Sequence, residues 1–317
     1  WAVSGRSESS SEDGETTVMT ERNPGGRTGK LFITGADGLL GKEIRRTFAA
    51  AYEILATDIA ECDVTSPEAC MRHVGEFLPD VVLHCAAYTA VDQAEQEERI
   101  AFDINAGGTR NMAIACREHR ALLVTFGTDY VFDGTSKRPY GEDDPTRPLS
   151  AYGRSKLAAE QALQEVAPDF LLLRTQWLFG APGRNFALSV LARAEKGEEL
   201  KIVSDQRGCP TYTRDLADAV QRLLDADARG IFHFSNEGET TFYDYAAFLL
   251  AHVGLSRAKL SAISSPDLPR EAYPAPRPAY AVLSKEKYRK TTGFSPRRWE
   301  DAVADFLRNR EKEETAG

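Results

Sequence analysis

The stretch KLFITGADGLLG, residues 30–41, places three glycines between an apolar run and an amphipathic segment. The apolar run predicts a β-strand, and the segment from about Gly38 predicts a helix. A tight turn, close approach of a pyrophosphate to the backbone, and close packing of helix on strand each require a missing side chain. The stretch therefore predicts a dinucleotide site. Its expected cofactor-binding residues are Gly35, Gly38, Leu39, Leu40 and Gly41.

Strand-like and helix-like segments alternate from Lys30 to about residue 180, with helices expected near 66–77 and 95–119. The expected strands are continuous apolar runs such as VVLHCAA and FLLLR, which is typical of a parallel sheet covered by helices on both faces. We therefore predict a doubly wound α/β fold of the Rossmann type. The expected domains are a dinucleotide-binding domain over 29–180, to which later segments return, and a smaller, mainly substrate-binding lobe over 181–317.

The composition of the 317 residues, 42% of them hydrophobic, is that of a globular chain with a buried core. No apolar run approaches the roughly 20 residues of a membrane helix. A net charge of −9 argues against nucleic acid as a partner, so an anionic ligand must meet local positive groups or helix N-termini. The five cysteines are scattered without a C-x-x-C spacing, which favours reduced thiols in the cytoplasm.

The first 28 residues are rich in Ser, Glu, Thr and Gly and show no apolar periodicity. We expect a disordered tail or an expression leader there, with Met19 available as a natural start.

Acidic residues follow the second expected strand. This strand ends at Asp58, whose carboxylate is placed to hold the adenosine ribose hydroxyls or, alternatively, to close an ordinary turn. A carboxylate at the ribose favours NADH, but the adjacent loop gives no evidence either way, so NADH and NADPH both stay open. Asp63 and Val64, in CDVTS, are expected to line the adenine.

The segment AYGRSK, residues 151–156, begins another expected helix with a tyrosine and a lysine four residues apart. Side chains at i and i+4 share one helix face, so the Lys156 ammonium can act on the Tyr152 phenol. The same spacing also fits plain surface packing. Of the 11 tyrosines, Tyr152 is the one followed by lysine at this spacing.

The glycine turn and the Tyr-x-x-x-Lys pair together resemble the extended short-chain dehydrogenase/reductase family. More blocks carry the resemblance toward the C-terminus: HCAAYTAVDQAE, INAGGTRNMA, GTDYVFDG, LLRTQWLFG, DQRGCPTYTRDLA and RPAYAVL. Within that family they are similar to the NAD(P)H-dependent reductases that convert dTDP-4-dehydro-L-rhamnose to dTDP-L-rhamnose. The resemblance thus implies a sugar-nucleotide ketoreductase with NADPH or NADH as cofactor and a dTDP-sugar as substrate, and it is compatible with a homodimer.

The resemblance also implies catalytic roles. Hydride addition to a ketone leaves an alkoxide, which needs a proton donor and a hydrogen-bond donor. Tyr152 is the expected proton donor. Lys156 is expected to lower the pKa of the phenol and to bond the nicotinamide ribose, and Thr128 to hold the carbonyl oxygen.

Further binding residues follow from the same resemblance. Asn105 is expected to pin a helix and order a water beside the lysine. The expected cofactor-lining residues after the third strand are Ala86, Ala87 and Tyr88. The expected substrate-binding residues are Val91, Thr128, Asp129, Trp177, Asn185 and Arg277, the last two as holders of the diphosphate. Packing for Trp177, a helix cap for Asn185 and a surface charge for Arg277 are the alternatives.

Two positions depart from the family pattern, since Gly127 and Ala281 stand where serines are usual. Two other functions also remain open. One is a NAD(P)-binding regulatory subunit resembling that of methionine adenosyltransferase, and the other is an epimerase or dehydratase of the same fold. Tyr130 after Asp129 argues against the dehydratase, which would use a glutamate there. No acidic cluster predicts a metal site.

Overall fold

The computed structural model describes residues 29–167, 169–181, 183–255 and 258–316. The expectation for residues 1–28 lies outside the described residues. No described helix is long and apolar enough to cross a membrane.

A six-stranded parallel sheet forms the centre of the protein, with the order β10-β5-β4-β3-β1-β2. Its strands are β1 (Gly29–Thr34), β2 (Tyr52–Thr57), β3 (Val81–His84), β4 (Leu122–Thr128), β5 (Phe170–Thr175) and β10 (Gly230–His233). Because Thr34 pairs with both Thr57 and His84, the carboxyl ends of β1, β2 and β3 are level. The predicted doubly wound fold is confirmed.

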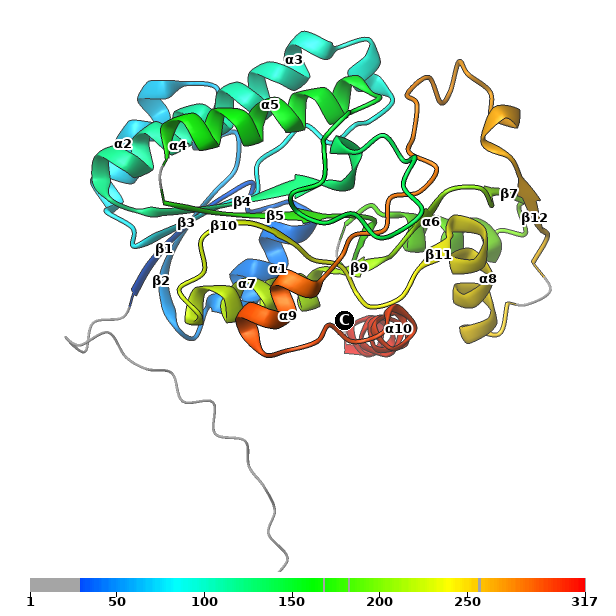
Figure 1. Ribbon diagram of the computed structural model, residues 1–317. Helices are drawn as coiled ribbons and strands as arrows, with labels where there is room; N and C mark the ends of the chain where they lie inside the picture. Colours follow the sequence, from blue (N-terminus) through cyan, green and yellow to red (C-terminus); the bar gives the residue numbers. More distant parts are fainter. Residues whose placement is uncertain (1–28, 168, 182, 256–257, 317) are drawn as a thin grey trace, which may run out of the picture.

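Helices cover both faces of this sheet (Figure 1). One face carries α1 (Leu39–Phe48), α7 (Thr213–Asp225) and α9 (Glu286–Thr292). The other carries α2 (Pro67–Phe77), α4 (Gly108–His119) and α5 (Ala151–Val166). Each layer buries its own apolar cluster, one including Ile44 and Val220 and the other Val74 and Met112. The sheet is therefore buried on both faces, which explains its continuous apolar strands.

The segment expected as one helix near 95–119 is divided. It contains the 3₁₀ turn η1 (Gln93–Glu95), α3 (Glu98–Phe102), the π-helical turn η2 (Asp103–Gly107) and α4. The π-helical turn contains Asn105, and such turns are frequent at functional sites.

The second lobe packs around its own aromatic cluster, which includes Phe179, Tyr245 and Trp299. Its helices are α6 (Phe186–Glu195), α8 (Phe242–His252) and α10 (Trp299–Ala316). Its short strands are β6 (Leu178–Phe179), β7 (Leu200–Val203), β8 (Arg207–Gly208), β9 (Thr211–Tyr212), β11 (Thr240–Thr241) and β12 (Leu260–Ile263). The 3₁₀ turns η3 (Asp129–Val131) and η4 (Ser265–Asp267) complete the elements. The chain from β6 onward thus supplies this lobe and also β10, α7 and α9 beside the sheet.

Candidate active site

The glycine turn between β1 and α1 is built for close backbone approach. Gly35 has φ +63°, and a Cβ there would lie 2.7 Å from the Ala86 nitrogen. A Cβ on Gly41 would lie 2.3 Å from the Gly35 oxygen. Gly38 differs, because a Cβ there would meet just the Gly35 oxygen, at 3.2 Å, among the described atoms. Gly35 and Gly41 therefore serve packing, whereas Gly38 leaves open space in front of the turn, as a bound pyrophosphate requires.

The first turn of α1 begins at Gly38 without a side-chain cap from the described residues. Its N–H groups are thus available to an anion. Leu40 is buried in the core of the sheet, so its backbone alone can face a cofactor, whereas Leu39 lies against the Gly183 backbone.

Asp58 reaches back to the glycine turn. Its Oδ2 accepts the N–H of Asp37 at 3.0 Å, and its Oδ1 accepts the N–H of Ile59. The N–H of Asp58 in turn donates to Glu61 Oε2 at 3.0 Å. The carboxylates of Asp58 and Glu61 thus lie close together where the adenosine ribose is expected. The loop 58–63, DIAECD, contains no lysine or arginine.

The two residues expected at the adenine are tied to local structure. Asp63 Oδ1 accepts both the N–H and the hydroxyl of Thr65. Val64 is 6% exposed and packs on α4, where a Cβ on Gly108 would lie 2.8 Å from it. Their expected contact with the adenine stays a prediction.

Asn105 links the end of β3 to α5. Its Oδ1 accepts the N–H of Tyr88 at 2.9 Å, and its Nδ2 donates to the Tyr88 carbonyl and to Ser155 Oγ. The Ser155 hydroxyl donates to the carbonyl of Tyr152. The partly buried Ala86, Ala87 and Tyr88 therefore lie beside the start of α5.

Thr128, at the end of β4, and Tyr152, at the start of α5, come together. A side-chain hydrogen bond links the two, and Thr128 Oγ1 also donates to Asp129 Oδ1 at 3.0 Å. The Tyr152 ring packs edge-on against Tyr130, with centroids 5.5 Å apart. Burial raises the pKa of Tyr152 to about 12, although the bond with Thr128 opposes the shift and Asp129 adds to it.

Desolvation is the largest cause of this shift, and Lys156 is not among its causes. The expected lowering of the phenol's pKa by Lys156 stays a prediction. Lys156 is itself 7% exposed, and burial lowers its pKa to about 8 against the opposing charge of Glu160. A phenol with a raised pKa stays protonated at neutral pH, which is the form that a proton donor needs.

Asp129 lies directly behind this pair. It is 2% exposed, and its Oδ2 has no hydrogen-bond partner among the described residues. Burial raises the pKa of Asp129 to about 7. An unsatisfied buried carboxylate oxygen is unusual and indicates a group that meets a ligand.

Trp177 is held in a fixed orientation in the second lobe. Its φ is +46°, uncommon for a bulky residue, and its ring stacks on Phe242 at 3.7 Å between centroids. A Cβ on Gly208 would lie 2.7 Å from the indole. The ring remains partly exposed, so packing and substrate contact are both compatible with its position.

Arg277 forms a bond that the sequence did not indicate. Its Nη2 and Nη1 donate to Asp92 Oδ2 and Oδ1 at 2.6 and 3.0 Å, which joins the second lobe to the loop after Val91. Asp92 lies 185 residues before Arg277 in the chain, so no local pattern pairs the two.

Asn185 is the N-cap residue of α6. Its Oδ1 caps this helix by accepting the Leu188 N–H, and its Nδ2 donates to the Gly180 carbonyl at 2.7 Å. Both polar atoms have partners within the chain, which is the helix-cap alternative. A hollow of about 660 Å³ opens beside Asn185. It is lined by Gly183, Arg184, Asn185, Phe186, Leu188 and Ser189.

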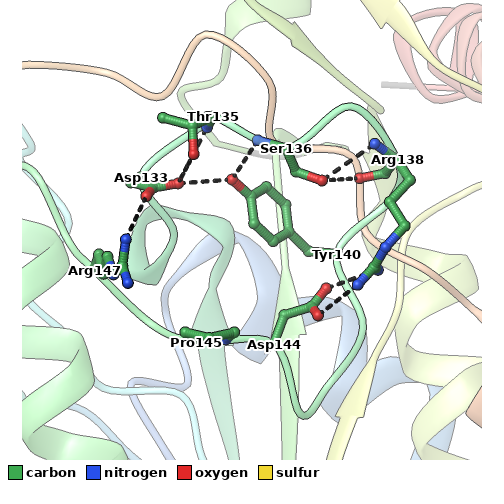
Figure 2. A pocket seen from close by; sticks show the side chains of 8 residues that line it. All are labelled: Asp133, Thr135, Ser136, Arg138, Tyr140, Asp144, Pro145 and Arg147. Atoms are coloured by element: carbon green, nitrogen blue, oxygen red, sulfur yellow. Dashed lines mark hydrogen bonds and ion pairs between the residues drawn. The ribbon is translucent and has the colours of Figure 1, made fainter.

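A smaller hollow of about 190 Å³ lies in the loop after η3 (Figure 2). Both of its arginines are paired, Arg138 with Asp144 at 2.8 Å and Arg147 with Asp133 at 4.0 Å. Tyr140 donates to Asp133 across it. This hollow therefore presents a locally neutralised surface and is separate from the Thr128–Tyr152 pair.

The family model described as RmlD substrate binding domain matches residues 29–312. The chain belongs to the RmlD family. Among its relatives in this family, dTDP-4-dehydrorhamnose reductase of Mycobacterium tuberculosis is 39% identical over 293 residues, 89% of this chain and 93% of that protein. This confirms the predicted resemblance.

Two solved structures are similar to this RmlD family member. A dTDP-4-dehydrorhamnose reductase from Clostridium acetobutylicum has a TM-score of 0.85 and 36% identity, covering 89% of this chain and 99% of that one. A dTDP-4-dehydrorhamnose reductase from Bacillus anthracis, in complex with NADP, has a TM-score of 0.84 and 32% identity, covering 89% and 100%.

Proposed function

We propose that the chain reduces the 4-keto group of dTDP-4-dehydro-L-rhamnose to give dTDP-L-rhamnose, with NADH or NADPH as the reductant, in dTDP-rhamnose biosynthesis. The observation that carries the proposal is that Thr128, at the end of β4, lies beside Tyr152 on α5, the helix that also presents Lys156. Membership in the RmlD family and the names of the M. tuberculosis and C. acetobutylicum relatives support the substrate. The NADP in the B. anthracis relative supports the cofactor.

The cofactor fits the first domain. The open space at Gly38 and the uncapped start of α1 suit the pyrophosphate, and the Asp58 carboxylate suits a ribose hydroxyl. When bound, NADH or NADPH supplies the hydride. The Lys156 ammonium would donate to the nicotinamide ribose, and Asn105 would hold the loop after β3 in place beside it.

The two hydroxyls act on the ketone oxygen. The Tyr152 hydroxyl would exchange its hydrogen bond with Thr128 for one to that oxygen, and the Thr128 hydroxyl would exchange its hydrogen bond to Asp129 in the same way. As negative charge develops there, Tyr152 transfers its proton to the oxygen, which is more basic than the phenolate left behind. Thr128 is buried and Tyr152 partly buried, which limits the access of water as a competing donor.

We assign the cofactor and the sugar nucleotide to different lobes. Residues 29–180, with the returning β10, α7 and α9, would hold the cofactor. Residues 181–317 would mainly hold the sugar nucleotide, with Trp177 against the ligand. Val91 and Asp129 would lie toward the sugar. Arg277 would serve the diphosphate while sharing its charge with Asp92.

The setting in the cell is part of the proposal. We place the protein in the cytoplasm, supported by five free thiols in the described residues. A homodimer stays a prediction.

Steady-state oxidation of NADH and NADPH with dTDP-4-dehydro-L-rhamnose tests the function. We expect one cofactor oxidised for each sugar reduced. Cofactor binding without oxidation would instead favour a regulatory subunit, and sugar conversion without net oxidation would favour an epimerase.

A further inference from the structure

Glu160 and Arg174 form an ion pair inside the protein, one helical turn beyond Lys156. Their side chains are 3% and 4% exposed. Arg174 donates from Nε to Glu160 Oε1 at 3.0 Å and from Nη2 to Oε2 at 2.8 Å. Tyr152, Lys156 and Glu160 are spaced by four residues on α5, so they share one helix face. The ion pair thus extends the row of side chains that begins with the proposed proton donor.

Other contacts prevent the guanidinium of Arg174 from moving. Its Nη1 donates to the Glu142 carbonyl at 3.1 Å and to His233 Nε2 at 3.3 Å, and it lies over the Phe132 ring. His233 Nδ1 donates to the Tyr140 carbonyl, and burial lowers the pKa of His233 to about 3, so the ring is neutral and accepts at Nε2. Arg174 therefore holds the Glu160 carboxylate from a fixed point on β5.

Gly127 makes room for this pair. A Cβ at Gly127 would lie 2.8 Å from Glu160 Oε1 and 2.9 Å from Arg174 Cγ. Any side chain there would displace the carboxylate or the arginine. The glycine that departs from the family's serine is thus explained by packing, and it directly precedes Thr128.

Few groups can balance the charge of Lys156. Tyr152 and Glu160 lie on its own helix face, and His84 and Cys85 face it from the end of β3 and the residue that follows. Burial lowers the pKa of His84 to about 3 and raises that of the Cys85 thiol, so both are neutral, as is the Tyr152 phenol. Among these groups, Glu160 therefore supplies the negative charge.

We propose that Glu160 is a positioning residue for Lys156: Arg174 and the space at Gly127 fix its carboxylate, which keeps the lysine an ammonium and directs it at the cofactor and Tyr152. Stability alone is a weak reason for the pair, because well-packed apolar residues often replace buried ion pairs without loss. The role given to Lys156 rests on the proposed function, whereas the charge effect on it does not.

The test is the double variant Glu160→Met/Arg174→Met, which removes both charges together and leaves neither unpaired. NADH affinity is measured against pH by fluorescence titration, and kcat/KM alongside it. In the wild type, NADH affinity and kcat/KM should both decline at high pH. In the double variant we expect this decline to begin at least about half a pH unit lower, which corresponds to about a threefold lower NADH affinity at a given pH within the decline. The KM for the sugar nucleotide should not change.

The matched control is Glu98→Gln/Arg154→Gln, which removes the ion pair between Glu98 of α3 and Arg154 of α5, whose side chains are 49% and 41% exposed. It should leave both pH profiles unchanged. An unshifted profile in the methionine variant, or an equal shift in the control, would overturn the proposal.

Gly127→Ala provides a second test should the methionine variant fold poorly. It should shift the profile in the same direction, and no shift in this variant would also count against the proposal. The NADH titration needs no turnover. If the wild type proved inactive with the sugar nucleotide, the proposed function would fail, but the titration would still test the role of Glu160.

Discussion

Replacing Tyr152 by phenylalanine should remove most turnover and leave the fold intact. The substitution keeps the ring, which packs edge-on against Tyr130 and beside the small buried cluster of Ala94, Ala101 and Ala151. It removes the hydroxyl and its bond with Thr128. The net effect of one hydrogen bond on stability is about 1 kcal/mol, so the melting temperature should fall by a few degrees at most.

The rate should fall much further than the stability. Loss of a general acid typically reduces a rate by about 10²- to 10⁴-fold, and the lost hydrogen bond to the ketone oxygen adds to this. We expect at least a hundredfold loss, equivalent to about 2.7 kcal/mol in the barrier. Since the pKa of Tyr152 is raised to about 12, the wild type keeps its proton donor throughout the neutral range, and the loss should be constant across that range.

The assay is steady-state NADH oxidation with the 4-keto sugar nucleotide, with cofactor affinity measured by fluorescence. Tyr245→Phe is the matched control, because the Tyr245 hydroxyl is buried without a partner among the described residues. It should keep its turnover. A Tyr152→Phe enzyme with more than about a tenth of wild-type turnover would refute the reasoning.

Four further outcomes are expected. Gly38→Val should abolish cofactor binding without lowering the melting temperature, and normal NADH affinity in this variant would contradict the proposed cofactor site. Gly41→Ala should instead disrupt the glycine turn, because its Cβ would lie 2.3 Å from the Gly35 oxygen. Trp177→Ala should weaken sugar-nucleotide binding more than NADH binding, as measured by calorimetry. It should also lower the free energy of unfolding by about 1 kcal/mol, because the indole no longer stacks on Phe242. Burial depresses the pKa of Lys156 from 10.5 to about 8, so the unfolded chain binds more protons between these values. As the pH rises from about 8 to about 10.5, the free energy of unfolding of the wild type should therefore increase relative to that of Lys156→Met, as measured by denaturant titration. A difference between the two proteins that does not change with pH would contradict this expectation. NADH should bind more tightly than NADPH because carboxylates line the corner at Asp58, and Asp58→Ala should narrow the ratio of the two dissociation constants.

The central sheet and its helices could be predicted because the sequence patterns that specify them are local. Apolar runs, the glycine turn and the spacing of the helices all lie within short windows, and together they specify a parallel sheet. The return of β10 to the sheet beside β5 was not specified in detail. It depends on pairing between segments about 60 residues apart, and the four residues GIFH alone do not predict a partner.

The site was predictable where chemistry follows spacing, as at Tyr152 and Lys156. Three features were not. The direction of the phenol's pKa depends on burial, which a spacing does not reveal. The partner of Arg277 is distant in the chain. The reason for Gly127 appears only once Glu160 and Arg174 are seen packed against it.

The central claim is that a hydride from the nicotinamide reaches the sugar ketone while Tyr152 supplies the proton. The most direct measurement uses NADH deuterated at the transferable position, with dTDP-4-dehydro-L-rhamnose, followed by mass spectrometry and NMR of the product. The account predicts dTDP-L-rhamnose with one deuterium bonded to C4. The Tyr152→Phe enzyme should form at least about a hundredfold less of this labelled product over the same time. Unlabelled product, or label at another carbon, would contradict it.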